Sequence, residues 1–322
     1  MIGELESRPA TADDLPAIIE LLAQSMGRAD DARFDALFRW KHLENVFGPS
    51  PMWVACDRDR IVGLRVFMRW EFERAGRIVR CVRAVDTATH PDYQGRGIFK
   101  RLTLDALAPM EADGVEFVFN TPNSQSRPGY LKMGWHEVGR ARACVRPLSL
   151  GGAVRLARSR VPASHWSEPL SGGRPVADVI ADPALGELLA RRGREPEVFC
   201  TRVDVPFLAW RYGTPLLDYR AVIAPGGLTQ GVAFVRLRTR GRAREVVLAG
   251  LVTPSPAPPR GLVREVVGSL RGQADYVLGV GRLPGCVRVP TFGPVVTTRD
   301  VVTSAPREIG AFAFSLGDLE LF

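Results

Sequence analysis

The chain has 322 residues, of which 46% are hydrophobic and 24% charged, so it is long enough and apolar enough for two folded domains. Its formal net charge of +8 comes almost entirely from arginine, and it has no dense basic run with interleaved aromatic residues. We therefore expect no nucleic-acid partner, and the lack of an apolar run of membrane-spanning length argues against a membrane partner.

The first residues and the cysteines bear on the expected location. Residues 1–6 carry two glutamates and lack the basic and apolar segments of a signal peptide, which predicts a cytoplasmic protein. The cysteines have neither the spacing of a disulfide framework nor that of metal ligands, so we expect buried thiols and no metal. They are Cys56, Cys81, Cys144, Cys200 and Cys286.

Residues 11–22 predict the first helix. Thr11 can cap it, Asp13 and Asp14 fall in its first turn, and apolar residues then follow with helical spacing from Leu15 to Leu22.

Residues 82–107 predict a strand, a glycine loop and a helix. An apolar run ends at Ala88, the loop holds Gly95, Arg96 and Gly97, and helical apolar spacing begins at Ile98. Backbone N–H groups at a helix start can bind a pyrophosphate, glycines allow its close approach, and an arginine adds a planar fork of donors. The loop is neither a Walker loop nor a dinucleotide fingerprint. The alternative is an ordinary glycine turn.

The loop resembles the acyl-CoA loop of the GNAT acyltransferase superfamily. Gln94, Gly97 and the lead-in His90-Pro91-Asp92 match that pattern, whereas Phe99 stands where the family usually has a small residue. Phe99 would therefore either point into the core beside the following helix or shift the adenine end of the cofactor. By this resemblance, the residues that hold an acyl-CoA are Thr87, Ala88, Thr89, Gln94, Gly95, Arg96, Gly97, Ile98, Phe99 and Asn123.

The next segments fit the same resemblance. Residues 115–120 predict a strand, and residues 130–135 resemble the family's Tyr-x-x-x-Gly-Phe segment, with Trp135 in the aromatic place. The resemblance implies that Tyr130 is the acid that protonates the leaving CoA thiolate, a proton transfer that a phenol can perform. The alternative is an aromatic residue at the edge of the core with its hydroxyl in water.

The general base is ambiguous from the sequence. Asp86 lies on the strand before the loop and is our first candidate, although strand alternation can turn it away from the cleft. A water chain without a dedicated side-chain base is equally compatible. Asp318, Glu320 and the chain terminus at Phe322 offer further carboxylates, and some aminoglycoside-acetylating relatives use such a terminus.

A repeat organises the chain. The aromatic and basic run at residues 34–42 recurs at 206–212, and in both halves strands, a helix and a further strand follow. Where the first copy has its glycine loop, the second has the proline-rich residues 255–261, whose prolines lack the N–H groups that would hold a phosphate. We predict a GNAT domain binding acyl-CoA at 1–148, a linker at 149–175, and a degenerate GNAT-like domain at 176–322.

The predicted fold class is mixed α/β, with two tandem domains that each have a splayed mixed sheet flanked by helices. The resemblance implies an acyl-CoA-dependent N-acyltransferase, with acetyl-CoA as the expected donor. Its acceptor would be a primary amine of a small molecule such as an amino sugar, an aminoglycoside or another antibiotic scaffold. The alternatives are a non-catalytic, regulatory acyl-CoA-binding module and a protein-lysine acetyltransferase. The chain could act as a monomer or a homodimer.

Overall fold

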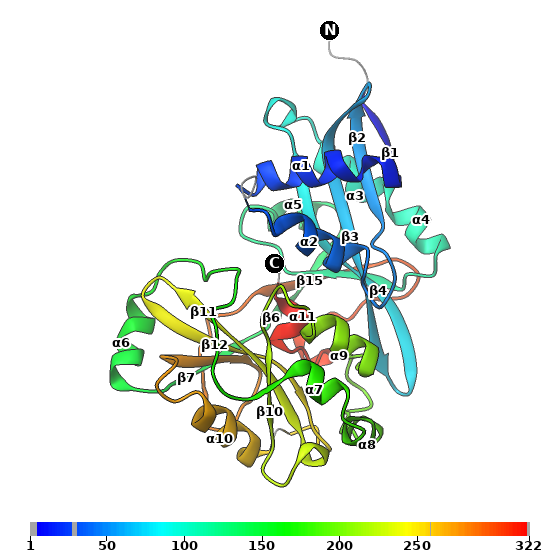
Figure 1. Cartoon of the computed structure of the whole chain (residues 1–322). Helices are drawn as coiled ribbons and strands as arrows, with labels where there is room; N and C mark the ends of the chain where they lie inside the picture. The colour runs from blue at the N-terminus through cyan, green and yellow to red at the C-terminus, as the bar shows by residue number, and fades with distance from the viewer. Residues whose placement is uncertain (1–4, 28–30, 258, 321–322) are drawn as a thin grey trace. The chain divides into compact units, whose positions relative to one another are not determined.

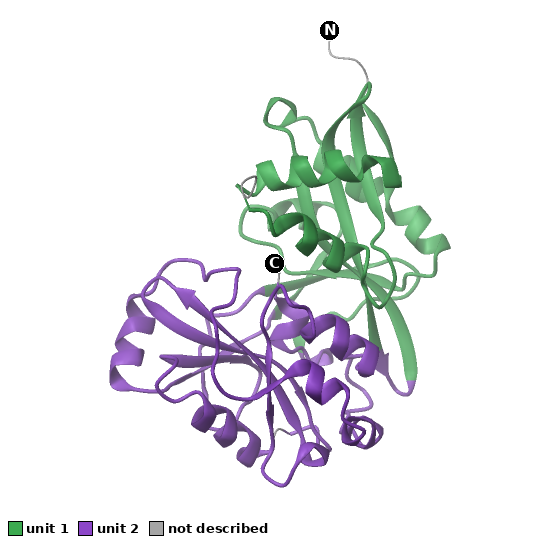
Figure 2. Ribbon diagram, viewed as in Figure 1, with its two compact units in different colours: residues 1–72, 77–139, 295–309 green, residues 73–76, 140–294, 310–322 purple. Residues whose placement is uncertain are grey.

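The structure is a computed structural model that describes residues 5–27, 31–257 and 259–320 (Figure 1). The chain divides into two compact units (Figure 2). Unit 1 comprises residues 1–72, 77–139 and 295–309, and unit 2 comprises residues 73–76, 140–294 and 310–322. Within the described ranges, no helix is both long enough and apolar enough to cross a membrane.

Unit 1 is built on a mixed sheet with the order β1-β2-β3-β4-β5-β15-β6. Its strands are β1 (Glu6–Pro9), β2 (Met52–Asp57), β3 (Arg60–Arg74), β4 (Arg77–Thr89), β5 (Phe117–Asn120), β6 (His136–Arg140) and β15 (Val295–Asp300). β4 and β5 are parallel, and their pairing runs from Cys81 and Phe117 to Arg83 and Phe119. β4 then continues to Thr89 without β5, so the two strands part at their carboxyl ends.

Five α-helices within the described part of unit 1 flank this sheet. They are α1 (Leu15–Ser25), α2 (Phe34–His42), α3 (Ile98–Asp105), α4 (Leu107–Ala112) and α5 (Arg127–Lys132). In Figure 1, α1 and α2 lie on the viewer's side of the strands. α3 packs closely on β3, because Gly63 leaves room for it: a Cβ there would lie 2.5 Å from Ile98. Leu102 continues this buried contact into the core of the unit.

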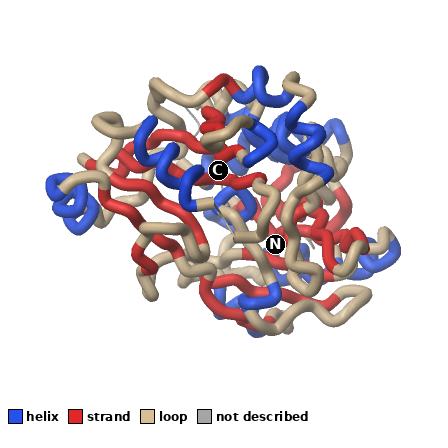
Figure 3. Tube along the Cα trace, turned by 90° about the horizontal axis from the view of Figure 1, so that it is seen from below, coloured by secondary structure: helices blue, strands red, loops and turns tan. Residues whose placement is uncertain are grey.

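Unit 2 has its own sheet, with the order β14-β7-β13-β12-β11-β10-β8. The strands of this sheet are β7 (Ala143–Pro147), β8 (Arg174–Pro175), β10 (Arg220–Ile223), β11 (Val232–Arg240), β12 (Ala243–Val252), β13 (Tyr276–Val280) and β14 (Val287–Arg288). Residues of unit 2 also form the short strand β9 (Cys200–Thr201), which is not part of this sheet. Its helices are α6 (Leu150–Arg158), α7 (Val176–Ile180), α8 (Ala184–Ala190), α9 (Val205–Tyr212), α10 (Arg260–Ser269) and α11 (Leu316–Leu319). Figure 3 distinguishes the helices from the strands by colour.

The two sheets repeat one pattern, as the sequence predicts. In unit 2, β12 and β13 are parallel over Glu245–Val247 and Tyr276–Leu278, and β12 then continues beyond this pairing to Val252. The antiparallel pair β10–β11 precedes them. The predicted fold class is therefore confirmed: two mixed sheets, each flanked by helices.

Each sheet contains a strand from a distant part of the chain. β15 comes late in the sequence but lies between β5 and β6 in unit 1, while β7 follows β6 directly and lies beside β13 in unit 2. The compact units accordingly divide the chain at 139/140 and 294/295, rather than near 148. Residues 149–175, which the sequence predicts to be a linker, contribute α6 and β8 to unit 2.

Candidate active site in unit 1

The glycine loop opens α3 with exposed backbone. Gly97 is the residue before the helix and has φ +77°, and Gly95 has φ +76°, a region that glycine enters without steric cost. Apart from the adjacent residues of the chain, no atom lies within 4 Å of the Cβ position at either glycine, so the space in front of the loop is open. Ile98 is buried and anchors the first turn. The arrangement presents helix-start N–H groups to solvent, which suits an anion.

The polar side chains of the loop fold back onto it. Arg96 donates from Nη2 to the Asp92 carbonyl oxygen over 2.8 Å, and its guanidinium lies 4.8 Å from the centre of the Tyr93 ring. Gln94 donates from Nε2 to the Thr89 carbonyl oxygen over 3.4 Å. The backbone therefore provides the loop's outward-facing donors, and these side chains stiffen it.

Tyr130 lies on α5 and is 4% exposed. Asn123 organises the turn before this helix, since its Oδ1 accepts from the backbone N–H groups of Gln125 and Ser126 over 3.0 and 2.8 Å. Trp135 packs against the Tyr130 ring with the centroids 5.3 Å apart. The sequence places Asn123 at the cofactor, whereas the contacts in the structure give its Oδ1 a role in shaping the start of α5.

Arg65 is a site residue that the sequence analysis missed. It lies on β3, is 1% exposed, and donates to the Val85 carbonyl oxygen over 3.0 Å and to the Tyr130 hydroxyl over 2.5 Å. A guanidinium has donors only, so the phenolic oxygen is the acceptor and its own proton remains available for another partner. The sequence signal was a charged residue inside the apolar strand Ile61–Phe67.

Phe99 joins the first turn of α3 to this pair. Its ring meets Tyr130 edge-on, with centroids 5.3 Å apart and planes at 89°, and the Arg65 guanidinium lies 5.4 Å from its centre. Of the two orientations that the sequence left open, the structure has the ring packed against the core. The glycine loop, Phe99, Tyr130 and Arg65 thus form one continuous assembly.

Asp86 lies in a buried polar cluster. Its Oδ2 is 2.5 Å from Lys41 Nζ and 2.7 Å from His42 Nε2, and His42 Nδ1 is 2.9 Å from Ser50 Oγ. Burial alone would raise the pKa of Asp86, but Lys41 and His42 outweigh it and hold that pKa well below its ordinary value. Burial lowers the pKa of His42. Asp86 is therefore ionised and already paired, which makes it a weak proton acceptor at neutral pH.

The remaining predicted residues lie at the end of β4 or in unit 2. Thr87 donates from Oγ1 to the Leu64 carbonyl oxygen over 3.0 Å, Ala88 is buried, and Thr89 ends the strand. Asp318 and Glu320 belong to unit 2, where both are buried in hydrogen-bonded groups. Phe322 and its terminal carboxylate lie outside the described residues.

A family model agrees with this geometry. Residues 6–138 match the model of the acetyltransferase (GNAT) domain, and this range contains the glycine loop, Arg65 and Tyr130. This part of the chain is a GNAT domain. The resemblance drawn from the loop is therefore confirmed. No curated protein sequence matches the chain.

Solved structures of similar fold span most of the chain and thus parts of both units. A probable N-acyltransferase from Enterococcus faecalis V583 aligns with a TM-score of 0.66 and 11% identity, over 93% of this chain and 73% of that one. A GCN5-related N-acetyltransferase from Anabaena variabilis ATCC 29413 aligns with a TM-score of 0.63 and 15% identity, over 92% of this chain and 73% of that one. A GCN5-related N-acetyltransferase from Kribbella flavida aligns with a TM-score of 0.59 and 16% identity, over 93% of this chain and 72% of that one. At these identities the likeness is one of fold.

Proposed function

We propose that the chain is an acyl-CoA-dependent N-acyltransferase, with acetyl-CoA as the expected donor and the primary amine of a small molecule as the acceptor. One observation carries the proposal: the open glycine loop, through Phe99, adjoins a tyrosine whose hydroxyl accepts from a buried arginine. The GNAT match over residues 6–138 supports acyl transfer in general.

In this proposal the donor lies along the carboxyl end of β4. Its pyrophosphate would accept from the N–H groups of residues 95–99, where the start of α3 favours negative charge. Its pantetheine arm would lie beside Thr87, Ala88 and Thr89, past the point where β4 and β5 stop pairing. Ligands in open α/β sheets commonly bind outside the carboxyl ends of parallel strands.

The chemical step is direct attack of the amine on the thioester. The nitrogen forms a bond to the carbonyl carbon, the carbon–sulfur bond breaks, and the departing sulfur takes a proton from the Tyr130 hydroxyl. Solvent then returns a proton to Tyr130. Arg65 donates to the phenolic oxygen throughout, so it stabilises the negative charge that develops there as the proton leaves.

The attacking nitrogen must also lose a proton. Asp86 was the first candidate from the sequence, but its carboxylate contacts Lys41 and His42 and its pKa is held low. This environment supports the alternative in which water carries the proton to solvent. Asp86 then serves to hold α2 against β4.

A thiol-release assay tests the proposal. The full chain is incubated with acetyl-CoA and a panel of amino sugars, aminoglycosides and simple amines, and free CoA is measured with a thiol reagent. We expect amine-dependent CoA release that Tyr130→Phe lowers. Acyl-CoA binding without release for any amine would favour the regulatory module, and release only with lysine-containing peptides would favour a protein-lysine acetyltransferase.

A cytoplasmic location is part of the proposal. The described cysteines are all free thiols, and four of the five are buried, which is the usual state in a reducing compartment.

A further inference from the structure

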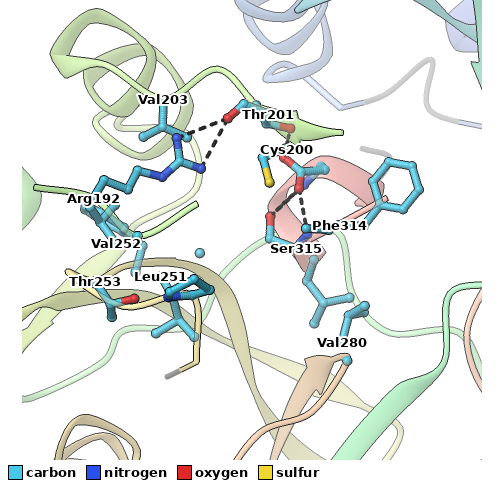
Figure 4. A pocket seen from close by; sticks show the side chains of 18 of the residues that line it. Arg192, Cys200, Thr201, Val203, Leu251, Val252, Thr253, Val280, Phe314 and Ser315 are labelled. Carbon is cyan, nitrogen blue, oxygen red and sulfur yellow. Dashed lines mark hydrogen bonds between the residues drawn. The ribbon is translucent and has the colours of Figure 1, made fainter. Parts of the chain in front are cut away.

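Unit 2 contains a cavity of about 290 Å³ whose lining residues all belong to that unit (Figure 4). It lies where β12 and β13 part, since residues 250–253 line one side and residues 280–283 another, beyond the paired segments. The carboxyl ends of parallel strands are a common position for ligands. Its volume lies just below the range of about 300–1,000 Å³ that is typical of ligand pockets, so it suits a small molecule.

Much of the cavity wall is apolar. α9 contributes Leu208, β11 contributes Phe234, and β12 contributes Leu248 and Leu251. Leu283 follows β13 and also lines the space. Such a wall takes an apolar group, and the affinity of that group comes from the surface it removes from water.

Arg192 and Arg194 line one side of the cavity, and in the part of the chain that the structure describes the two arginines have one carboxylate between them. The side chain of Arg192 is only 12% exposed, and it donates to the Thr201 carbonyl oxygen over two long distances of 3.3 Å (Figure 4). Among the described residues, Arg192 has an ion pair only with Glu73, whose Oε2 lies 4.0 Å from Arg192 Nη1. The same oxygen lies 3.0 Å from Arg194 Nε. Two guanidinium groups thus share one carboxylate, whereas buried charges in proteins are normally paired.

Gly193 fixes these two arginines at the cavity. Its N–H donates to the Thr253 carbonyl oxygen over 2.9 Å at the end of β12. A Cβ on Gly193 would lie 2.3 Å from the carbonyl carbon of Ser255, so only glycine allows this close approach. Because Arg192 and Arg194 flank Gly193, their backbone is held against the strand end that forms the cavity.

The cavity lining has further charged groups of both signs. Asp318 accepts from Thr201 Oγ1 over 2.8 Å and from the Ser315 N–H and hydroxyl over 2.6 and 2.8 Å, and burial raises its pKa. Arg282 adds a further cation to the lining, and Glu195 adds an anion. Pro256 also lines the cavity and brings no N–H group, so the segment lacks the amide cradle of the unit 1 loop.

We propose that this cavity is a second ligand site, for a small organic monocarboxylate with a short apolar group. The carboxylate would pair with Arg192, whose planar fork suits its two oxygens, and the apolar group would lie among the leucines. The site is separate from the acyl-CoA loop of unit 1.

Calorimetric titration of the full chain tests this site. Sodium hexanoate is the probe, and hexanamide, which has the same shape and no charge, is its control. We expect hexanoate to bind at least about tenfold more tightly than hexanamide, as charged hydrogen bonds are the stronger kind. Arg192→Gln should abolish this preference. Arg191→Gln is the matched control, because Arg191 is exposed, bonds Thr229 and does not line the cavity.

Several outcomes would overturn the proposal. They are no hexanoate binding at millimolar concentration, equal affinity for hexanamide, an unchanged affinity in Arg192→Gln, and displacement of hexanoate by CoA. If Arg192→Gln does not fold, Arg194→Gln replaces it, because the side chain of Arg194 is 46% exposed. Without Arg194, Glu73 can pair fully with Arg192 and compete with the ligand for it. This variant should also weaken hexanoate binding, and an unchanged affinity would count against the site. Acyl transfer is not the readout, so failure here leaves the acyltransferase proposal intact.

Discussion

Nη2 of Arg65 donates a hydrogen bond to the Tyr130 hydroxyl over 2.5 Å, and Nη1 of the same residue donates to the Val85 carbonyl oxygen over 3.0 Å. Val85 lies on β4, the strand along which we place the thioester. The guanidinium therefore holds the tyrosine hydroxyl in a fixed relation to that strand. Because Arg65 cannot accept a proton, it leaves Tyr130 free to donate its own.

Tyr130→Phe should lower turnover by about 10²–10⁴-fold while leaving acyl-CoA affinity nearly unchanged, because the hydroxyl matters when charge develops on sulfur. Steady-state kinetics and calorimetric titration measure the two effects. Tyr93→Phe is the control, since its hydroxyl bonds Asp57 and not an arginine. Full turnover in Tyr130→Phe with its true acceptor would remove the residue from the mechanism.

Arg65→Lys should lower turnover as well, with little change in the KM for acyl-CoA. Lysine keeps the charge but lacks the planar fork that reaches both Val85 and Tyr130. The decisive measurement is a double-mutant cycle, in which Arg65→Lys should have little further effect on turnover in the Tyr130→Phe background. Additive losses in the double variant would show that Arg65 acts independently of Tyr130.

Gly97→Ala should weaken acyl-CoA binding at least about tenfold, through backbone strain at a left-handed position and through the added methyl group in front of the loop. Gly114→Ala is a matched control, because Gly114 has φ +75° and equally open surroundings but lies outside the loop. Gly261→Ala, in the proline-rich segment of the second copy, should leave acyl-CoA affinity unchanged. Equal losses in calorimetric titrations of all three variants would contradict the assignment of the loop.

Asp86→Asn separates a structural role from a catalytic one. Removing one partner of a buried ion pair costs about 3–5 kcal/mol, so the free energy of unfolding by urea should fall by that order. Asp35→Asn removes the exposed pair with Arg39, and this change should leave the free energy of unfolding nearly unchanged. A stable Asp86→Asn variant with a large loss of turnover would restore Asp86 as the base.

The stability of the chain should fall as the pH is lowered from about 7 to about 5. Burial lowers the pKa of His42 below its ordinary value of 6.5, so in this range the unfolded chain binds a proton that the native chain does not. Asp86 acts in a separate window, since its lowered pKa contributes stability that is lost only as the pH falls below 3.8. His42→Gln should flatten the dependence of the unfolding free energy between about pH 5 and 7. An unchanged slope would contradict the assignment.

The sequence could predict the glycine loop before α3 because contiguous residues carry that information, whereas the role of Tyr130 was implied only by the resemblance to the GNAT family. Gly97 stands at a left-handed position directly before a helix, and local chemistry sets such a turn. It could not predict Arg65 or the partners of Asp86, because side chains from three different elements form these contacts. The local sequence shows only that Arg65 and Asp86 are charged residues within apolar runs, and it does not indicate which residues they contact.

The placement of β15 was beyond the sequence for a different reason. The repeat predicts two similar sheets. It does not say which of two strands, β7 or β15, pairs with β5 and which pairs with β13, because either strand could fill either position. Backbone pairing is the same in either place, so the pattern of apolar residues alone cannot assign the strand.

The position of β15 has a consequence for how the protein forms during synthesis. Asn120 of β5 hydrogen-bonds Thr297 of β15, 177 residues later in the chain, so the ribosome has made most of unit 2 before the sheet of unit 1 can be completed. Pairings over such a separation fold slowly, and until then β5 presents an open edge that can pair with another chain. Expression of residues 1–148 alone should therefore yield an aggregation-prone fragment, and the nascent protein should depend on chaperones until its last strand emerges.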